Sequence, residues 1–355
     1  MSDSRRVIEE LRGEMKEVDV ELVKLLDRRA KLSKKVGAAR KDAPNAPIAD
    51  RASMIEIATT SSGEMPEASL REILARVHAE CLALEVPLPV AYAGPEGGRS
   101  DAAARSRFGH ASTYVRTEDA TVAFEEVTQK RAQFAVVPLE TRTDGPVQAT
   151  ILALMACDLR IVSCFEVAEN LDLVSRSGTM AGLDKIYAMP SDHAACAKSL
   201  AEAANGVPVL DVRSPSAGAE RVADDATAAA VISRGSAEQY KLSVVKSGVR
   251  DGGDERVRYA IVGARPSARS GNDLTALALS VADSPGALHE VLKQFAERGI
   301  NLTKIQSRPA AGEAWAYLFF IEVKGHVTDR NLVSALEEVK RLAKFYRVLG
   351  SYQAL

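Results

Sequence analysis

The sequence has few cysteines and histidines, and its charges nearly cancel. Cys81, Cys157, Cys164 and Cys196 form no CxxC pair and lie in apolar surroundings, so we expect buried, reduced thiols. The five histidines are scattered and form no HxxxH or HExxH pair, so a metal centre has no support. The formal net charge of −2 lacks the basic footprint of proteins that bind nucleic acids or membrane surfaces.

Long hydrophobic runs are also missing. No apolar stretch approaches the roughly 20 residues that span a bilayer. The first residues, MSDSRRVIEELRGEMKEVD, are charged throughout and lack the apolar core of a signal peptide. We therefore expect a cytoplasmic protein without a membrane partner. A chain of 355 residues is too long for one compact core, so its length predicts two or three domains.

The first segment has the apolar spacing of one long amphipathic helix, from about residue 4 to 40. At 1.5 Å per residue such a helix is roughly 55 Å long, more than a small domain can cover, so we expect a dimer whose partners bury each other's apolar seam. The prolines of KDAPNAP, residues 41–47, end this helix, and shorter helices are expected at about 50–60 and 67–86. The seam consists of Ile8, Leu11, Met15, Val18, Leu22, Leu25, Leu32 and Val36.

Three arginines lie on or beside this seam. The spacing reaches Arg29 and Arg40, and Arg12 lies one turn beyond Ile8. A buried guanidinium is costly unless it is paired, so this placement indicates a pocket for an anion such as a dicarboxylate. Alternatively, these side chains extend along the helix flank into solvent, as most long cationic side chains do, and periodicity alone favours that alternative.

The remaining chain divides into two segments. In residues 89–265, short β-branched runs alternate with Ala-rich helical stretches, which predicts a two-lobed α/β domain with a largely parallel sheet. The polar stretch ARPSARSGND, residues 264–273, is typical of a hinge. Residues 272–355 follow a βαββαβ order, which predicts an α+β ferredoxin-like unit of a kind that often pairs by its edge strands.

Several motifs along the chain point to one family. LRGEMKEVDVELVKLLDRRAKLSKKVGAAR is similar to the long helix of all-helical chorismate mutases. GPEGGRSDAA resembles the dehydratase signature GPxGTFSHxAA, AVVPLETRTDG resembles VPIENSxxG, and RVRYAIV resembles TRFxVI. SPGAL and KIQSRP match the GAL and ESRP motifs of the phenylalanine-binding ACT domain, and VLGSY its closing strand. The chain thus resembles the bifunctional chorismate mutase–prephenate dehydratase family over nearly its full length.

The resemblance implies a multidomain protein. Residues 1–88 would form an all-α, three-helix chorismate mutase domain, residues 89–265 a two-lobed prephenate dehydratase-like α/β domain, and residues 272–355 an ACT regulatory domain. Substrates would be chorismate and prephenate, no cofactor is needed, and L-phenylalanine would be the effector. The assembly would be a homodimer or homotetramer.

Family mutases hold chorismate in a folded shape and place positive charge against the breaking ether oxygen. The resemblance implies catalytic roles for Arg12, Arg29 and Arg40, the last where lysine is usual, and for Asp50 and Glu85. A glutamate beside the ether oxygen can donate only when protonated, so activity should favour acidic pH.

The second mutase helix departs from the family pattern. The pattern Asp-x-x-Arg-Glu keeps Asp50, but its arginine and glutamate positions hold Ser53 and Met54. The substrate contacts of that turn are therefore in question.

The dehydratase signatures are altered more deeply. The departing hydroxyl of prephenate needs a proton donor, and the threonine of TRF is replaced by Val257, which keeps its shape without its oxygen. Mutase activity is therefore expected over dehydratase activity. Four other signature positions depart from the family: Asp101 and Met189 replace histidines, Thr141 replaces asparagine and Pro215 replaces threonine. Arg142 follows Thr141 directly. The substrate-binding candidates that remain are Ser100, Glu140, Ser216 and Arg258.

Two alternatives stay open for the middle domain. It could act on a prephenate-like substrate by another route, such as decarboxylation without aromatisation, or it could be a silent lobe within a phenylalanine-sensing regulator. The resemblance places the effector between paired ACT domains, near Gly286, Ala287, Leu288, Gln306, Ser307 and Arg308.

Overall fold

The computed structural model describes residues 3–40, 60, 63–85, 88–110, 112–142, 145–253, 255–309 and 317–354. The chain forms two compact units, the first made of residues 1–88 and 104–113 and the second of residues 89–103 and 114–355. Within the described ranges, no helix combines the length and apolar character that crossing a membrane would take.

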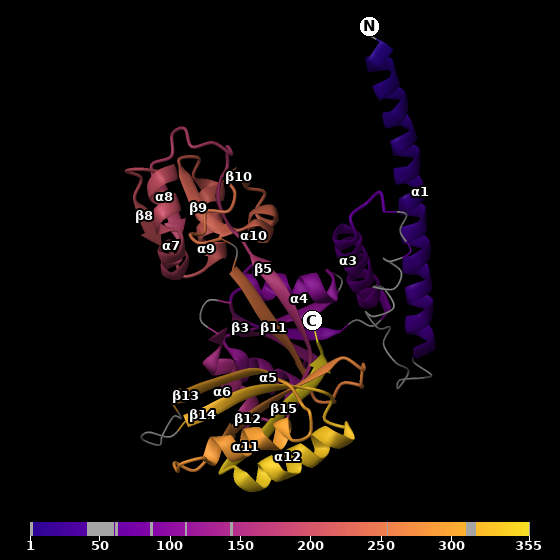
Figure 1. Cartoon of the computed structure of the whole chain (residues 1–355). Coiled ribbons are helices and arrows are strands. Elements are labelled where there is room, and N and C mark those ends of the chain that lie inside the picture. Colours follow the sequence, from indigo (N-terminus) through magenta and orange to yellow (C-terminus); the bar gives the residue numbers. More distant parts are fainter. Residues whose placement is uncertain are drawn as a thin grey trace. The chain divides into compact units, whose positions relative to one another are not determined.

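Two parallel helices form most of the first unit, α1 (Asp3–Arg40) and α3 (Glu67–Glu85) (Figure 1). The Arg29 Nη1 atom donates to the Val77 carbonyl oxygen at 3.2 Å, and eight residues later on both helices Gly37 meets the backbone of Glu85. The expected first and third helices are confirmed. The expected helix at about 50–60 lies outside the described residues.

The apolar seam of α1 is exposed within this chain. Its eight members, from Ile8 to Val36, are each between 46% and 65% exposed. Of the described elements, only α3 packs along α1, and it reaches the C-terminal part alone. Most of the seam is therefore uncovered within the described residues of one chain.

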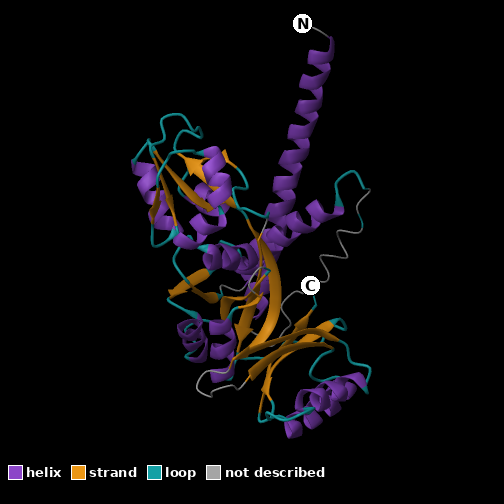
Figure 2. Cartoon of the chain, turned by 60° about the vertical axis from the view of Figure 1, so that its left-hand side comes forward, coloured by secondary structure: helices purple, strands orange, loops and turns teal. Residues whose placement is uncertain are grey.

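The second unit begins with a two-lobed α/β domain (Figure 2). The chain enters the second lobe through β5 (Arg160–Glu169) and returns through β11 (Glu255–Gly263), which pair antiparallel. The first lobe also contains β1 (Pro89–Ala93), β2 (Thr113–Thr117), β3 (Phe134–Thr141), β4 (Gly145–Pro146), α4 (Arg99–Phe108), α5 (Ala120–Thr128) and α6 (Gln148–Ala156). Residues 104–113, which include the second half of α4, count with the first unit.

The second lobe has a five-stranded sheet of its own, in the order β10-β6-β9-β7-β8. Its elements are β6 (Leu171–Ser175), β7 (Lys185–Ala188), α7 (Pro190–Ala195), α8 (Ala197–Ala203), β8 (Val209–Asp211), α9 (Pro215–Asp224), β9 (Ala228–Ser233), α10 (Arg234–Gln239) and β10 (Ser243–Lys246).

The prediction of largely parallel sheets was wrong. Strands β1 and β3 pair in parallel, as do β9, β7 and β8, but β11 pairs antiparallel with both β3 and β5, and β6 antiparallel with both β9 and β10. A chain that leaves one lobe and returns beside its own exit must run antiparallel there. Local sequence patterns carry no information about that return.

The C-terminal domain has the predicted ferredoxin-like order: β12 (Asp273–Ser280), α11 (Ala287–Ala296), β13 (Leu302–Pro309), β14 (Tyr317–Lys324), α12 (Arg330–Leu342) and β15 (Phe345–Gln353). Its strands lie in the order β13-β14-β12-β15. The two helices cover one face of this sheet, over a core that includes Leu277, Phe295 and Ile321.

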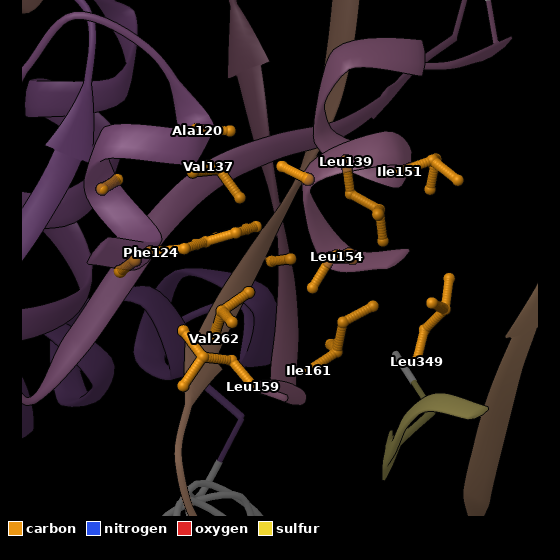
Figure 3. Close-up of a cluster of buried hydrophobic side chains, with 14 of the residues drawn as sticks. Ala120, Phe124, Val137, Leu139, Ile151, Leu154, Leu159, Ile161, Val262 and Leu349 are labelled. Carbon is orange, nitrogen blue, oxygen red and sulfur yellow. The ribbon is translucent and has the colours of Figure 1, made fainter. Parts of the chain in front are cut away.

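The other face of the C-terminal sheet packs on the first lobe. Phe320, Leu349 and Tyr352 share one buried cluster with Leu154 of α6 and Ile161 of β5 (Figure 3). In the described residues β15 pairs with β5 at one position, Gly350 with Ile161, which joins the two domains into a ten-stranded sheet. A Cβ atom at Gly350 would lie 2.2 Å from the Ile161 carbonyl oxygen, so this junction requires glycine.

The cysteines are free thiols, as predicted. Cys81, Cys164 and Cys196 are buried, whereas Cys157 is partly exposed. Burial raises the pKa of Cys164 to about 12, so this thiol stays neutral at physiological pH.

Two glycines of α1 give opposite predictions for alanine. A Cβ atom at Gly37 would lie 2.2 Å from the Glu85 carbonyl oxygen, so we expect Gly37→Ala to force α1 and α3 apart and lower the melting temperature. Gly13 has no atom within 4 Å of such a Cβ, and Gly13→Ala should stabilise the helix by about 0.5–1 kcal/mol. Thermal melts followed by circular dichroism measure both. Equal stabilisation by the two variants would contradict the close approach.

Candidate functional site

The predicted mutase residues are only partly brought together. Arg29 is half-buried against α3, and Glu85 lies at the C-terminal end of α3, beside Gly37. Arg12 is exposed on α1, seventeen positions before Arg29, which is roughly 25 Å along a helix. The side chain of Arg40, like Asp50, Ser53 and Met54, lies outside what the structure describes.

A cavity of about 520 Å³ opens between the two lobes of the second unit. From the first lobe it is lined by the loop after β1 and the end of β2, and from the second by the start of α9. The Ser214 hydroxyl caps α9 by accepting from the Ala217 backbone amide, and the hydroxyls of Ser214 and Ser216 lie 2.9 Å apart. The lining residues are Gly94, Pro95, Glu96, Arg116, Thr117, Glu118, Arg213, Ser214, Ser216, Glu220 and Tyr240.

The cavity carries two uncommitted positive charges. Neither Arg116 nor Arg213 forms an ion pair with another described residue, and both are exposed. The N-terminus of α9 adds its dipole and the serine hydroxyls. Of the predicted substrate-binding residues, Ser216 belongs to this cavity. The arrangement suits an anionic ligand, although Glu96, Glu118 and Glu220 restrict where its charge can lie.

Val257 is packed as a core residue. It is 3% exposed, lies in β11, and pairs with Thr141 on β3 and Val167 on β5. Paired residues of antiparallel strands project to the same face of a sheet, so Val257 shares its face with Thr141. Ser100, in the first turn of α4, is buried.

Arg258 lies on the opposite face of β11, where it contacts carboxylates of the protein itself. Arg258 Nη2 lies 2.8 Å from a carboxylate oxygen of Glu140 and 2.5 Å from one of Glu322 on β14. Lys304 of β13 also pairs with Glu140, and the Tyr352 hydroxyl donates to Glu322 at 2.5 Å. Glu140 and Arg258, both predicted to bind substrate, are thus brought together in a buried cluster at the junction with the C-terminal domain.

The cluster is held in fixed charge states. Burial disfavours the charge of Arg258, but the carboxylate of Glu322 helps to outweigh it, and the pKa of Arg258 is raised. Burial, with Cys164 and Glu322, raises the pKa of Tyr352 well above its ordinary value, so its hydroxyl remains a donor. Substrate binding by Glu140 and Arg258 stays a prediction.

The predicted effector residues fall into two groups. Gly286, with φ +83°, lies just before α11, so Ala287 and Leu288 form the first turn of that helix. Gln306 and Arg308 instead line a smaller cavity beside α6. The C-terminal ends of β12 and β13 lie at the same end of the sheet, because Leu279 of β12 and Ser307 of β13 both pair with Phe319 of β14.

Comparisons with known proteins match all three parts of the chain. Family models match it as chorismate mutase type II over residues 11–86, prephenate dehydratase over 90–267 and ACT domain over 275–341. The bifunctional chorismate mutase/prephenate dehydratase of Aquifex aeolicus is 33% identical over 353 residues, 97% of each chain. This chain belongs to that family. The Neisseria gonorrhoeae protein of the same name is 32% identical over 343 residues, 94% of each chain.

Solved structures match the second unit of this family member. Prephenate dehydratase from Arthrobacter aurescens, in complex with L-Phe, is 32% identical, with a TM-score of 0.67, over 75% of this chain and 90% of that one. A protein described as a novel type of quorum-quenching acylase, GqqA, is 26% identical, with a TM-score of 0.66, over 75% of this chain and 98% of that one. The multidomain fold predicted from the sequence, with mutase, dehydratase-like and ACT parts, is confirmed.

Two charged residues replace apolar residues of the family signatures and pair with each other. Arg99 stands at the phenylalanine of GPxGTFSHxAA. A further dehydratase motif, SHPxA, aligns with residues 188–192, so that Met189 stands at its histidine and Asp192 at its alanine. In the structure they form an ion pair that ties α4 in the first lobe to α7 in the second. Arg250 extends the charged group, because it lies near Asp192 and pairs with Glu255, at 3.1 Å, on β11.

A third departure is structural. Asp101, at the histidine position of the same signature, is 1% exposed and accepts from the Gly97 backbone amide at 2.8 Å. It therefore fixes the loop before α4. Met189, at the second histidine position, is the N-cap residue of α7 and makes no side-chain capping bond.

Sequence reasoning missed several of these charged residues. Arg99 and Asp192 could have been found as charges at two motif positions that are normally apolar. Lys304 and Glu322 could have been found as charges within strands, Glu322 between the apolar residues of YLFFIEVK. Their partners depend on how the domains pack, which the motifs do not encode.

We predict that Asp192 does not stabilise the fold at neutral pH. Burial raises its pKa although Arg99 and Arg250 lower it, so the folded state favours the protonated form. The Asp192 carboxyl group therefore adds to the free energy of unfolding at a pH below its ordinary pKa. This contribution is lost as the pH rises through the raised pKa of the folded state. At pH 7, Asp192→Asn should therefore keep or raise the melting temperature.

Arg99→Ala is the matched variant. It leaves Asp192 buried with Arg250 alone and should lower the melting temperature at pH 7. Differential scanning fluorimetry of both variants is sufficient. A large loss of stability in Asp192→Asn would show that the ion pair is mainly a structural element.

Proposed function

We propose that this chain rearranges chorismate to prephenate at a site completed by a second copy. The spacing of Arg12 and Arg29 carries this proposal. Roughly 25 Å of helix separates them, so they cannot grip one small dicarboxylate within one chain. An antiparallel or crossed partner helix, covering the exposed seam of α1, brings Arg12 of one copy toward Arg29 of the other.

The rearrangement requires only that the substrate is held in its folded shape and that positive charge lies near its ether oxygen. The rearrangement is pericyclic and needs no nucleophile or cofactor, so the protein contributes by folding the substrate and stabilising the charge that develops on the ether oxygen. Arg29 is preorganised for this task because the Val77 carbonyl holds it against α3. Arg12, Arg40, Asp50 and Glu85 complete the proposed site.

We propose that the dehydratase-like domain binds a prephenate-type dicarboxylate without efficient dehydration. The cavity between the lobes, with Arg116, Arg213 and Ser216, supports binding. The buried Val257 supports the loss of dehydration, because no hydroxyl remains at the position where the family places its proton donor. Ser100 lies near the start of α4 as a further binding candidate.

One alternative for the middle domain has a specific observation in its favour. The Arg99–Asp192 pair gives the two lobes a charged bridge that the family signatures lack, and one protein that shares this fold is described as an acylase. A changed reaction on a prephenate-like substrate, such as decarboxylation without aromatisation, is therefore the second candidate. A non-catalytic phenylalanine sensor is the third.

The setting is proposed from the family. The protein acts in the cytoplasm, in phenylalanine biosynthesis, and L-phenylalanine regulates it through the ACT domain, as a homodimer or homotetramer. The structure of the relative with bound L-Phe supports the effector.

We predict that purified protein consumes chorismate and that Arg29→Ala lowers kcat/KM about 100-fold, the scale of losing one charge-stabilising donor. Arg28→Ala is the matched control, because Arg28 is exposed on the same helix. Chorismate loss is followed by absorbance. Equal activity in the two variants, or no chorismate loss in the wild-type protein, would contradict the mutase proposal.

The same incubations separate the candidates for the middle domain. Phenylpyruvate should not accumulate, even in Val257→Thr, because Thr141, Asp101 and Met189 have changed as well. A new non-aromatic product from prephenate would favour the second candidate. Phenylpyruvate formed by the Val257→Thr variant would show that Val257 alone silences the site.

A further inference from the structure

The loop between β1 and α4, residues 94–98, is held by both lobes of the dehydratase-like domain. On the side of its own lobe, the Gly97 backbone amide donates to the buried Asp101 carboxylate at 2.8 Å. On the other side, the hydroxyl of Ser236, from α10 of the second lobe, donates to the Gly97 carbonyl oxygen at 2.6 Å. The approach is close, because a Cβ atom at Gly97 would lie 3.1 Å from the Gln239 Oε1 atom.

A second contact between the lobes follows directly along the chain. Arg99 begins α4, and its ion pair with Asp192 reaches α7 of the second lobe. Asp192 is buried, and a further charged neighbour, Arg250, lies in the second lobe between β10 and β11. If the lobes separate, Asp192 keeps Arg250 but loses Arg99, and a buried carboxylate that loses a cation is costly.

These contacts flank one wall of the cavity between the lobes. Gly94, Pro95 and Glu96 of the loop line the cavity, and so does Tyr240, which follows α10. The chain enters and leaves the second lobe through β5 and β11, which run between the lobes (Figure 1). A connection by two strands permits a hinge movement, so the separation of the lobes depends on the direct contacts between them.

We propose that Ser236 and the Arg99–Asp192 pair form a clasp that keeps the lobes closed around the cavity before a ligand arrives. Arg213 of the second lobe is then already in place with Arg116 of the first. An anionic ligand finds the site preformed and does not have to bring the lobes together. The three clasp residues are not among those that line the cavity, so they are positioning residues.

Double electron–electron resonance on the full-length protein measures the separation of the lobes. Nitroxide labels are attached through Thr121→Cys on α5 and Glu202→Cys on α8, both at exposed positions. Cys157→Ser removes the partly exposed native thiol. Dilution with unlabelled chains suppresses distances between copies. With the clasp intact and no ligand present, we expect one narrow distribution of distances.

The family motifs supply the replacement for the ion pair. They have phenylalanine and alanine where this chain has Arg99 and Asp192, so Arg99→Phe/Asp192→Ala removes both charges and keeps the residue types of the motifs. Combined with Ser236→Ala, this change should add a population of chains with a longer separation. Circular dichroism shows that each variant is folded.

Glu126→Ala/Arg131→Phe is the matched control. It removes an ion pair of the same kind, with 2.6 Å between its atoms, that lies wholly within the first lobe. The distribution of distances between the lobes should therefore stay as narrow as in the wild type.

Calorimetric titration with prephenate gives a second readout, and only this choice of probe rests on the proposed function. The apparent Kd rises in inverse proportion to the fraction of closed chains. A variant that is closed about one tenth of the time should therefore bind about 10-fold more weakly. The distances measured without ligand thus predict the affinity.

The clasp is overturned if the triple variant keeps the narrow distribution, or if the control broadens it equally. A loss of affinity at unchanged separation would also overturn it, since the three residues would then contact the ligand instead of positioning the lobes. If the wild-type protein does not bind prephenate, the proposed function of the middle domain fails, and the distance measurement still decides whether the clasp exists.

Discussion

A buried arginine joins the two domains of the second unit. Arg258 reaches from β11 to Glu140 in its own domain and to Glu322 in the ACT domain, and removing one partner of such a buried pair typically costs about 3–5 kcal/mol. The backbone adds one pairing in the described residues, Gly350 with Ile161. The apolar cluster stabilises the contact in proportion to its buried area, but hydrophobic burial is not directional. The charged contacts therefore determine where the ACT sheet lies against the lobe.

The two faces of β11 carry different kinds of side chain. Toward Arg258, a full set of charged partners is present and buried, with Lys304 and Tyr352 completing it. Toward Val257, the strand carries a buried apolar side chain, and Glu255, two residues earlier, pairs with Arg250. One side of β11 thus carries the charged contact to the ACT domain, and the other has no hydroxyl at position 257.

Much of this structure could be predicted from the sequence, for identifiable reasons. The period of α1, the βαββαβ order and the ACT motifs are local patterns, and all three were confirmed. The antiparallel return of β11, the partners of Arg258 and the bridge from Arg99 to Asp192 were not predicted, because each joins residues that are distant in the sequence or depends on a domain interface. A motif names Arg258 but does not show which side chains of the ACT domain surround it, so its contact with Glu322 could not be predicted, and its binding of a substrate carboxylate stays a prediction.

The most direct test of this account is a double-mutant cycle on the Arg258–Glu322 contact. The full-length protein is unfolded in urea, and a spectroscopic signal from the second unit is followed. The wild type is compared in this way with Arg258→Met, Glu322→Leu and the double variant. Each single variant should lose about 3–5 kcal/mol, since each leaves a buried charge behind, and the double variant should lose clearly less than the sum. If the two losses simply add, Arg258 and Glu322 act independently, and the domains are not joined through this pair.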